Sequence, residues 1–364
     1  MKMQVARDHL PEISADVWSM LQNDARPLLV YGMGNGAEKL LAQLARIGRR
    51  PAAVFASDEF VRGQNFCGYP VLCFREAIRR YPDGIILQAF ATRDPAVLAR
   101  ICDMAEKYEY RLPDMPVAGD VFFDTEFYAA HRCELEKTYD LLEDNLSKTI
   151  FSEIVAYKLD GKIGHLRRAF SCPADEAALL RSHTFRAVVD AGAYRGDTAA
   201  AWLSAFPETE CVFAVEPDAR NFVKLEAYAT SSQARGRVRP VRAALLDRPG
   251  EVRLAAGGNR NSTLFGGSHG ARTEMVSVTT VDDVVGDTRV DLIKYDVEGA
   301  EEAALQGSRR TILRDRPILA VSLYHRSEDL FNLPLIIRGI CKDYRLYIRR
   351  KECLPAWELM LYAV

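Results

Sequence analysis

The chain has 364 residues, of which 48% are hydrophobic and 27% charged, and its formal net charge is −2. This length predicts two domains, with three as an upper bound. The composition excludes a disordered, collagen-like or coiled-coil chain, and the near-neutral charge excludes a nucleic-acid partner held by bulk electrostatics. Only 11 of the 48 basic residues are Lys, so a Lys inside an apolar run deserves examination.

The cysteines and the N-terminal residues bear on metal sites and on localisation. None of the eight Cys forms a CxxC pair, and no His stands at ligand spacing beside them, which disfavours a zinc site. Residues 1–18 contain no apolar signal segment, and the longest apolar run, residues 85–91, is too short to span a bilayer. We therefore expect a reduced, cytoplasmic protein that does not insert into a membrane.

The first α/β pattern occupies residues 1–122. A Gly-rich turn, GMGNGA (32–37), joins the first apolar run to an amphipathic stretch, and Asp58 follows the second apolar run. This order is typical of a dinucleotide-binding fingerprint. The predicted elements are strands at 28–31, 52–55 and 84–90 and helices at 38–47 and 95–107.

Two interpretations of this first unit stand. The stretches VYGMGNGAEKLLAQL (30–44) and GYPVL (68–72) resemble the small Rossmann-like N-terminal domains of some sugar-nucleotide-modifying enzymes. One interpretation is nucleotide binding, which makes an NAD(P)-dependent oxidoreductase acting on a nucleotide sugar the rival function. The other is a scaffold or substrate-docking role, favoured because no catalytic constellation accompanies the turn and the unit is short for a full dinucleotide fold.

Residues 123–184 are predicted to form a helical connector. Residues 126–159 have helical spacing and lack Pro and Gly. This connector is a candidate contact surface for a homo-oligomer. Its apolar positions, which predict one buried stripe, are Leu135, Leu141, Leu142, Leu146, Ile150 and Ile154.

Residues 185–364 show a second α/β pattern, which predicts a mostly parallel doubly wound sheet. The last two strands are joined by a connection too short for a parallel crossover, so we expect them to pair antiparallel. Residues 251–280 are expected to be irregular β-structure, with the 257–270 loop either a lid over the acceptor or a hairpin tip. The predicted strands are 187–189, 211–215, 237–244, 290–295, 318–323, 344–349 and 357–363, and the helices 197–205, 218–230, 301–313 and 328–341.

The turn VVDAGAYRGDT (188–198) carries the most chemical information. A Gly-rich turn lets the backbone approach a ligand closely, and the following helix presents free N–H groups. Asp190 stands where a ligand ammonium is received, and Glu216 ends the next strand, where it accepts ribose hydroxyls. A carboxylate in this turn repels a pyrophosphate, so the pattern favours S-adenosylmethionine over a dinucleotide.

This half of the chain resembles the FkbM family of S-adenosylmethionine-dependent methyltransferases. The resemblance implies a seven-stranded Rossmann-like class I methyltransferase fold and O-methylation of a hydroxyl on a saccharide, glycolipid or polyketide-type product. Tyr194 and Arg195 depart from the family, whose first motif often has Asn after Gly-Ala. The matching stretches are VVDAGAYRGDT (188–198), FAVEPDARNFVKL (213–225), VRAALLDRPGEVRL (241–254), VTTVDDVV (278–285), VDLIKYDVEGAEEAALQG (290–307) and RPILAVSLYHRSEDLFNLP (316–334).

The resemblance also implies a set of cofactor-binding residues. Glu216 is expected to hold the ribose hydroxyls, Pro217 and Asp218 to lie beside the adenine, and Ala243 and Ala244 to flank it. The residues expected along the methionine and ribose end are Asp190, Gly192, Ala193, Tyr194, Gly196 and Thr198.

Candidate catalytic residues follow the next two strands. Lys294, Asp296 and Glu298 alternate along one strand and its exit, so they share a face. They form either a polar cluster at the active site or an internal salt bridge that supports the sheet. Asp296 is alternatively a ligand for a divalent cation, as in some small-molecule O-methyltransferases, but the sequence offers no further ligands, so no metal site is predicted. We expect Lys294→Ala to lose turnover and to retain cofactor binding.

His325 follows the strand at 318–323 and is a candidate general base, because the ordinary pKa of His suits proton removal near neutral pH. The alternative is a surface His at the start of the next helix. Three functions are therefore carried forward: a methyltransferase, an NAD-linked oxidoreductase, and a non-catalytic interaction protein that retains the fold.

Overall fold

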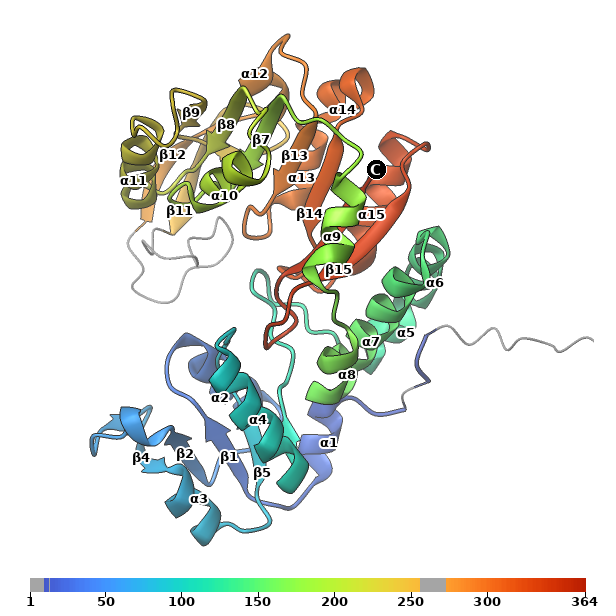
Figure 1. Cartoon of the computed structure of the whole chain (residues 1–364). Coiled ribbons are helices and arrows are strands. Elements are labelled where there is room, and N and C mark those ends of the chain that lie inside the picture. Colours follow the sequence, from blue (N-terminus) through green and yellow to red (C-terminus); the bar gives the residue numbers. More distant parts are fainter. Residues whose placement is uncertain (1–9, 13, 256–272) are drawn as a thin grey trace, which may run out of the picture.

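The computed structural model of the chain describes residues 10–12, 14–255 and 273–364, so the predicted 257–270 loop lies outside the described residues. Two α/β units lie one above the other, with helices α5 to α9 along one side of them (Figure 1). No helix of the described part has the length and apolarity needed to cross a bilayer.

The first unit is built on a six-stranded sheet of order β3-β4-β2-β1-β5-β6, parallel except for β3. The predicted strands at 28–31, 52–55 and 84–90 are its β1, β2 and β5. Strands β3, β4 and β6 were not predicted. β3 and β6 have two residues each, too few for a period-2 pattern, and Pro70 within β4 argues against a strand there. The strands are β1 (Leu28–Tyr31), β2 (Ala53–Ala56), β3 (Asn65–Phe66), β4 (Tyr69–Cys73), β5 (Ile85–Gln88) and β6 (Tyr110–Arg111).

Four helices and one turn of 3-10 helix accompany this sheet. Helix α4 has the predicted bounds, and α2 begins three residues before its prediction, within the Gly-rich turn. The helices are α1 (Val17–Asn23), α2 (Asn35–Arg46), α3 (Phe74–Arg80) and α4 (Pro95–Lys107), and the 3-10 turn is Asp58–Phe60.

The connector is a set of short helices instead of one continuous helix, which corrects the expectation for residues 126–159. The chain leaves helical geometry at Leu142, and the Asp144 side chain caps the next helix by accepting from the backbone N–H of Ser147 at 2.7 Å. Such an N-cap starts a separate helix after the break, a feature that helical spacing alone does not indicate. The helices are α5 (Thr125–Ala130), α6 (Arg132–Leu141), α7 (Asn145–Asp160), α8 (Ile163–Arg168) and α9 (Pro173–Leu180).

Most residues of the predicted apolar stripe pack inside this chain. One core cluster contains side chains from both sheets. It also includes the buried residues Leu135, Leu142, Ile150 and Ile154, and the half-buried Leu141 and Leu146 pack against it. Arg350 also ties the connector to the second unit, because its guanidinium donates to the carbonyls of Leu166 and Ala169.

The second unit contains the predicted seven-stranded sheet, in the order β15-β16-β14-β13-β7-β8-β9. β16 pairs antiparallel with both β14 and β15, which confirms the expectation for the last two strands. The strands of this sheet are β7 (Ala187–Ala191), β8 (Cys211–Val215), β9 (Val238–Val241), β13 (Leu292–Tyr295), β14 (Ile318–Ser322), β15 (Leu346–Arg350) and β16 (Leu359–Ala363).

Two predicted elements of this unit are each divided. The predicted strand at 237–244 is β9 plus a separate strand that pairs with the 250–279 region, so a small three-stranded sheet stands beside the large one. The predicted helix at 301–313 breaks at Gly307, where a Cβ would lie 2.1 Å from the carbonyl oxygen of Leu246. The remaining strands are β10 (Ala244–Leu245), β11 (Gly250–Ala255) and β12 (Thr273–Thr279).

Helices cover both faces of the large sheet, as the alternation of β and α elements predicts (Figure 1). They are α10 (Asp197–Ala205), α11 (Ala219–Ala229), α12 (Val281–Val285), α13 (Glu301–Gln306), α14 (Arg309–Asp315) and α15 (Asp329–Ile340).

Candidate functional site

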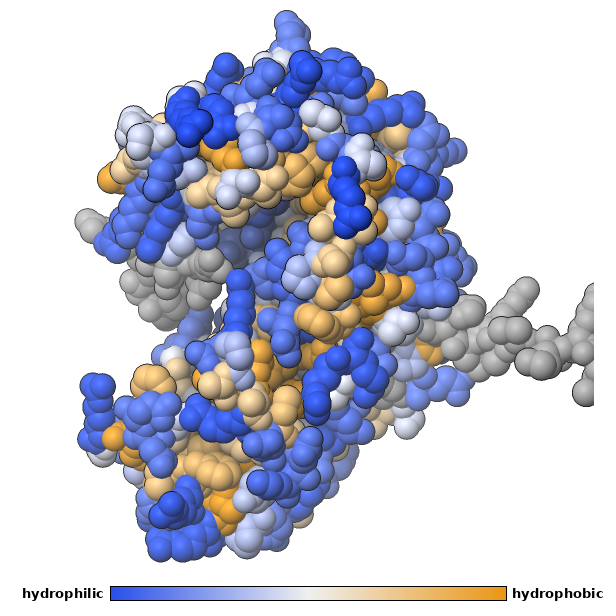
Figure 2. Space-filling model, in the orientation of Figure 1, coloured by the Kyte–Doolittle hydropathy of each residue, from blue (hydrophilic) through white to orange (hydrophobic). Residues whose placement is uncertain are grey.

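A cavity of about 880 Å³ opens at the carboxyl ends of the central strands of the large sheet. This volume falls in the range of about 300–1,000 Å³ that is usual for small-molecule sites, and the molecule is hollowed between its upper and lower parts (Figure 2). The predicted site residues that line the cavity are Asp190, Gly192, Tyr194, Thr198, Glu216, Pro217, Ala243, Ala244, Lys294, Asp296 and Glu298.

Four predicted site residues do not line it. Ala193 is fully buried in the core beneath α10 and α11. Gly196 packs beside Tyr228 and Leu225, with no room for a side chain. Asp218 caps α11 through the backbone N–H groups of Arg220 and Asn221. His325 is fully buried, so it has no direct access to an acceptor in the cavity.

The turn between β7 and α10 follows from close packing of two backbone segments. Gly192 has φ +81°, and a Cβ there would lie 1.9 Å from the carbonyl oxygen of Asp296, so only glycine fits. Tyr194 also has a positive φ, of 50°, which is strained for a residue with a side chain. The result is a turn whose backbone meets the exit of β13 at the cavity.

Glu216 lies directly after β8 and links that strand to the same turn. Its Oε2 accepts from the backbone N–H of Tyr194 and its Oε1 from that of Asp218, both at 2.9 Å. Burial raises the pKa of Glu216 to about 7 even though these two N–H groups favour the ionised form. The Glu216 carboxylate is therefore fixed in place and retains acceptor capacity toward a ligand diol.

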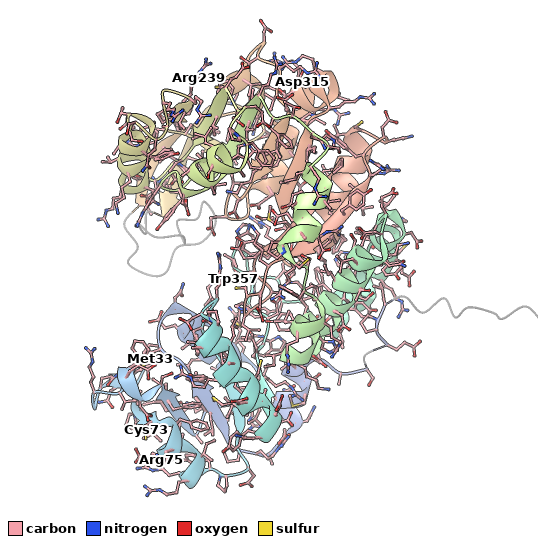
Figure 3. All side chains as sticks on the ribbon, viewed as in Figure 1. Met33, Cys73, Arg75, Arg239, Asp315 and Trp357 are labelled. Carbon is pink, nitrogen blue, oxygen red and sulfur yellow. The ribbon has the colours of Figure 1, made fainter. Side chains whose placement is uncertain are left out.

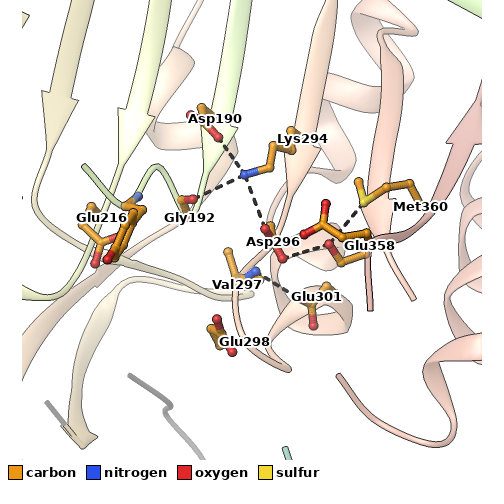
Figure 4. Close-up of polar contacts among 12 residues, drawn as sticks. Asp190, Gly192, Glu216, Lys294, Asp296, Val297, Glu298, Glu301, Glu358 and Met360 are labelled. Atoms are coloured by element: carbon orange, nitrogen blue, oxygen red, sulfur yellow. Dashed lines mark hydrogen bonds and ion pairs between the residues drawn. The ribbon is translucent and has the colours of Figure 1, made fainter. Parts of the chain in front are cut away.

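Lys294 lies in β13 beside β7, and its ammonium joins both strands (Figure 4). Its Nζ donates to Asp190 Oδ1 at 3.1 Å and to the Gly192 carbonyl at 3.4 Å, and it lies 3.6 Å from Asp296 Oδ2. Burial opposes the charged form, but the two carboxylates raise the pKa of Lys294 above its ordinary value. Lys294 thus stays protonated and is a counter-ion within the site.

Asp190 is 2% exposed, and burial raises its pKa in spite of the neighbouring ammonium. Its Oδ1 meets Lys294, whereas Oδ2 has no hydrogen-bond partner among the described residues. A carboxylate oxygen that lines a cavity and has no hydrogen-bond partner is suited to bind a ligand cation.

Asp296 and Glu298 follow β13, and their side chains lie in different environments. Asp296 Oδ1 accepts from the hydroxyls of Ser322 at 2.9 Å and Tyr324 at 3.0 Å; despite burial, Lys294 and His325 lower the pKa of Asp296. Glu298 has a positive φ of 55°, and no hydrogen bond to its carboxylate is found within the described residues. Burial and the neighbouring carboxylates raise the pKa of Glu298 to about 7.

His325 is surrounded by carboxylates behind the cavity wall. Glu301 Oε1 lies 2.9 Å from its Nδ1, and Asp296 Oδ1 and Glu298 Oε2 lie 3.6 and 3.7 Å from its Nε2. Burial disfavours the charged ring, yet these acids raise the pKa of His325 to about 10. This environment does not suit the predicted general base, since such a ring holds its proton.

Several cavity residues were not predicted from sequence. Thr92, Arg93 and Val117 come from the first unit, and they face Tyr324, Trp357 and Glu358 of the second. Trp357 lies between the two units (Figure 3), and Arg93 forms an ion pair with Glu358. Residues more than 200 positions apart carry no shared local pattern, so only the fold brings them together.

The first Gly-rich turn has a packing role in the structure. A Cβ at Gly36 would lie 2.3 Å from the carbonyl oxygen of Ala89, so glycine there permits α2 to approach the β5 exit. A separate cavity of about 300 Å³ is lined by Tyr31, Asp58 and Arg100 among others, and residues 32–37 do not line it. Of the dinucleotide fingerprint, Asp58 therefore lines this cavity, whereas the Gly-rich turn lines neither of the two cavities described.

Comparisons with known proteins agree with this geometry. Residues 190–349 match the family model of the methyltransferase FkbM domain. The crystal structure of methyltransferase FkbM from Methylobacillus flagellatus KT superposes with a TM-score of 0.71 at 21% identity, covering 94% of this chain and 90% of that one. At this identity the superposition establishes the fold, which extends over both units.

Other solved structures are more distant. Precorrin-6y C5,15-methyltransferase from Geobacter metallireducens GS-15 has a TM-score of 0.34 at 11% identity, covering 52% of this chain and 86% of its own. Fibrillarin from Aeropyrum pernix, with natively bound S-adenosyl-L-methionine, has a TM-score of 0.31 at 16% identity, covering 52% and 74%. Neither similarity is strong enough to carry an argument. None of the curated proteins matches the chain.

Proposed function

We propose, from the methyltransferase FkbM domain that residues 190–349 carry, that this protein is an S-adenosylmethionine-dependent O-methyltransferase. Its acceptor is a hydroxyl on a saccharide, glycolipid or polyketide-type product. The observation that carries the proposal is the single cavity that contains Asp190, Glu216 and Glu298. This cavity unites groups suited to a cofactor ammonium, a cofactor ribose and an acceptor hydroxyl.

The residues present fit S-adenosylmethionine. The buried, unpartnered Oδ2 of Asp190 is suited to the ammonium of the methionine end. The Glu216 carboxylate, positioned by two backbone N–H groups, is suited to the ribose hydroxyls, with Pro217, Ala243 and Ala244 around the adenine. When bound, S-adenosylmethionine supplies an electrophilic methyl group on a sulfonium.

Glu298 is the group we assign to the acceptor proton. It lines the cavity with 26% of its side chain exposed, and its carboxylate is free of hydrogen bonds within the described residues. Asp296, by contrast, is engaged by two hydroxyls and an ammonium. Lys294 and Asp296 therefore position the β13 exit, and Glu298 removes the proton as the acceptor oxygen attacks.

A second part of the cavity lining supports the proposed acceptor class. Tyr324 and Trp357 lie with ring centroids 6.4 Å apart and an interplanar angle of 30°, and Arg93 and Glu358 stand beside them. Aromatic faces bordered by charged hydrogen-bonding groups suit an amphipathic, polyhydroxylated molecule better than a purely apolar one.

Ligand-induced thermal stabilisation tests the cofactor. We expect S-adenosylmethionine and S-adenosylhomocysteine to raise the melting temperature of the protein, and NAD and NADP to leave it unchanged. Stabilisation by NAD alone would overturn the proposal in favour of the oxidoreductase.

Transfer of a labelled methyl group to panels of saccharides, glycolipids and polyketides tests the reaction. We expect Glu298→Gln to lower the rate by about 10²–10⁴-fold at unchanged S-adenosylhomocysteine affinity. Glu302→Gln, at an exposed position nearby, is the matched control and should retain full activity. Binding without transfer to any panel would favour the interaction protein.

A further inference from the structure

A second polar cluster lies behind the wall that carries Asp296 and Glu298. Glu301 is the first residue of α13, His325 follows β14, and Asp329 is the first residue of α15. These three side chains are 0%, 0% and 3% exposed, and one donor atom from each lies within 4.8 Å of the others. The fold therefore brings an imidazole and two carboxylates together in the buried interior.

The cluster contains polar atoms that lack hydrogen bonds. Both ring nitrogens of His325 and Oε2 of Glu301 have no hydrogen-bond partner among the described residues. Nδ1 lies 2.9 Å from Glu301 Oε1, a contact that is an ion pair while the ring is protonated. Buried polar atoms are rarely left unpaired. Once Nδ1 has lost its proton, it and the carboxylate oxygens beside it are close enough together to act as ligands of one cation.

The charge of the surroundings is also unbalanced. Glu301, Asp329, Asp296 and Glu298 all face His325. The nearest Lys, Lys294, is engaged by Asp190 and Asp296, and Nε of Arg326 donates to the carbonyl of Gly299. Among the described residues, the protonated ring of His325 is thus the cationic side chain in contact with these acids. A divalent cation that displaces the Nδ1 proton adds one positive charge to the cluster.

We propose that Glu301, Asp329 and Nδ1 of His325 form a structural site for a divalent cation of the Zn²⁺ or Mn²⁺ type. One imidazole and two carboxylates are a mixed nitrogen and oxygen donor set, which these ions accept more readily than Mg²⁺ or Ca²⁺. The set differs from Asp296, the ligand considered from sequence, and it lies outside the methyl-transfer cavity.

The backbone already orients both carboxylates for this role. The N–H of Val297 donates to Oε1 of Glu301 at 2.8 Å (Figure 4), and the N–H of Arg326 donates to Oδ2 of Asp329 at 2.8 Å. With Nδ1 on the cation, Nε2 of His325 carries the proton and points toward Asp296 and Glu298. Such outer contacts are typical of metal-binding His and carboxylates.

A cation here adds a shared contact among three segments: the start of α13, the exit of β14 and the start of α15. Hydrogen bonds from Arg326 to Asp329 and from Asn332 to Glu302 already connect them. The Val297–Glu301 contact extends that link to the loop that holds Glu298. The site thus stabilises the loop that carries the acceptor-facing carboxylate, and it takes no direct part in the reaction.

Metal content and calorimetry on the full-length protein test the proposal without any activity assay. After chelator treatment, the wild-type chain is titrated with Zn²⁺ and, separately, with Mn²⁺. We expect one ion per chain and a higher melting temperature in its presence. Glu301→Gln and Asp329→Asn are expected to weaken binding at least about tenfold, whereas Glu302→Gln, the exposed neighbour on α13, should bind like the wild type.

Two results would overturn the site. The first is the absence of stoichiometric binding of either ion to the wild-type chain, in which case a protonated His325 is the cation of the cluster. The second is binding that Glu301→Gln and Asp329→Asn leave unchanged, which places the ion elsewhere. The wild-type titration needs no variant, so misfolding of a variant does not decide the outcome. Metal binding is also measured without methyl transfer, so a failed transfer assay does not affect it.

Discussion

Lys294 contacts the residue expected to receive the cofactor ammonium. Its Nζ donates to Asp190 Oδ1, so the charge of the cofactor-binding carboxylate is balanced from within the protein. From sequence, Lys294 was expected either to act in turnover without affecting cofactor binding or to form an internal salt bridge that supports the sheet. The contact links it instead to both binding and stability, because Asp190 is 2% exposed and a buried carboxylate requires a partner.

Lys294→Ala is expected to lower the free energy of unfolding by about 3 kcal/mol, because it leaves Asp190 buried and unpaired. S-adenosylhomocysteine affinity should fall as well. Chemical denaturation and calorimetric titration measure the two effects. The double variant Lys294→Ala/Asp190→Asn is the control, and it should recover part of the lost stability; unchanged stability in Lys294→Ala would contradict the pairing.

Glu216 is expected to make cofactor binding depend on pH. Burial raises its pKa to about 7, and ribose hydroxyls donate best to the ionised form, so binding strengthens as pH rises. We expect S-adenosylhomocysteine affinity to increase about tenfold from pH 6 to pH 8. Isothermal titration over this range is the measurement, and Glu216→Gln should bind weakly with a flat profile.

The same shift has the opposite sign for folding. Because the pKa of Glu216 is higher in the folded state than its ordinary value of 4.5, its ionisation disfavours the folded chain. This residue therefore contributes less stability as pH rises from about 4.5 to about 7.

Two connections, β7 to α10 and β13 to α13, form the cavity wall together. Gly192 in the first packs against the carbonyl of Asp296 in the second. Tyr194 in the first segment and Glu298 in the second both have positive φ values. Backbone strain of this kind persists where the surrounding structure enforces it. The site is therefore a property of paired turns as much as of side chains.

Gly192→Ala is expected to lower the free energy of unfolding by roughly 3–5 kcal/mol, from backbone strain and overpacking combined. Gly34→Ala is the matched control, because Gly34 also has a positive φ but has no atom within 4 Å of the added Cβ. That variant should lose about 1–3 kcal/mol from strain alone. Equal losses in urea denaturation would argue against the close approach of Gly192 to Asp296.

At the scale of the whole molecule, the two units share one apolar core. A single cluster of buried side chains contains Leu29 and Phe55 of the first unit, Ile150 of the connector, and Ile293 and Leu346 of the second. Backbone hydrogen bonds also cross between units, from Ala118 to His325 and in both directions between Thr92 and Leu354. We therefore expect the units to unfold together.

Single-tryptophan variants test this cooperativity. Trp202→Phe/Trp357→Phe leaves Trp18 as the reporter in the first unit, and Trp18→Phe/Trp357→Phe leaves Trp202 in the second. Their fluorescence transitions in urea should coincide, as in a two-state protein. Separate midpoints would show that the shared core does not couple the units.

Long elements with strong periodicity were predictable from local pattern. Strands β1, β2 and β5 of the first sheet, the parallel strands of the second, helix α4 and the antiparallel final pair all follow from apolar runs, turn residues and connection lengths. The turn at 188–198 and the motif from Lys294 to Glu301 identified Asp190, Lys294 and Glu298 among the cavity residues in the same way, because the carboxyl ends of parallel strands meet at one edge.

What the sequence determined is thus which elements form and which chemistry two of their turns carry. The tertiary structure alone decided that His325 is buried among acids, that Lys294 pairs with Asp190, and that Thr92 and Arg93 face Trp357 across the cavity. Period and spacing report local geometry, whereas burial and charge pairing depend on contacts between residues distant in the chain. Those contacts form only when both units pack around their common core.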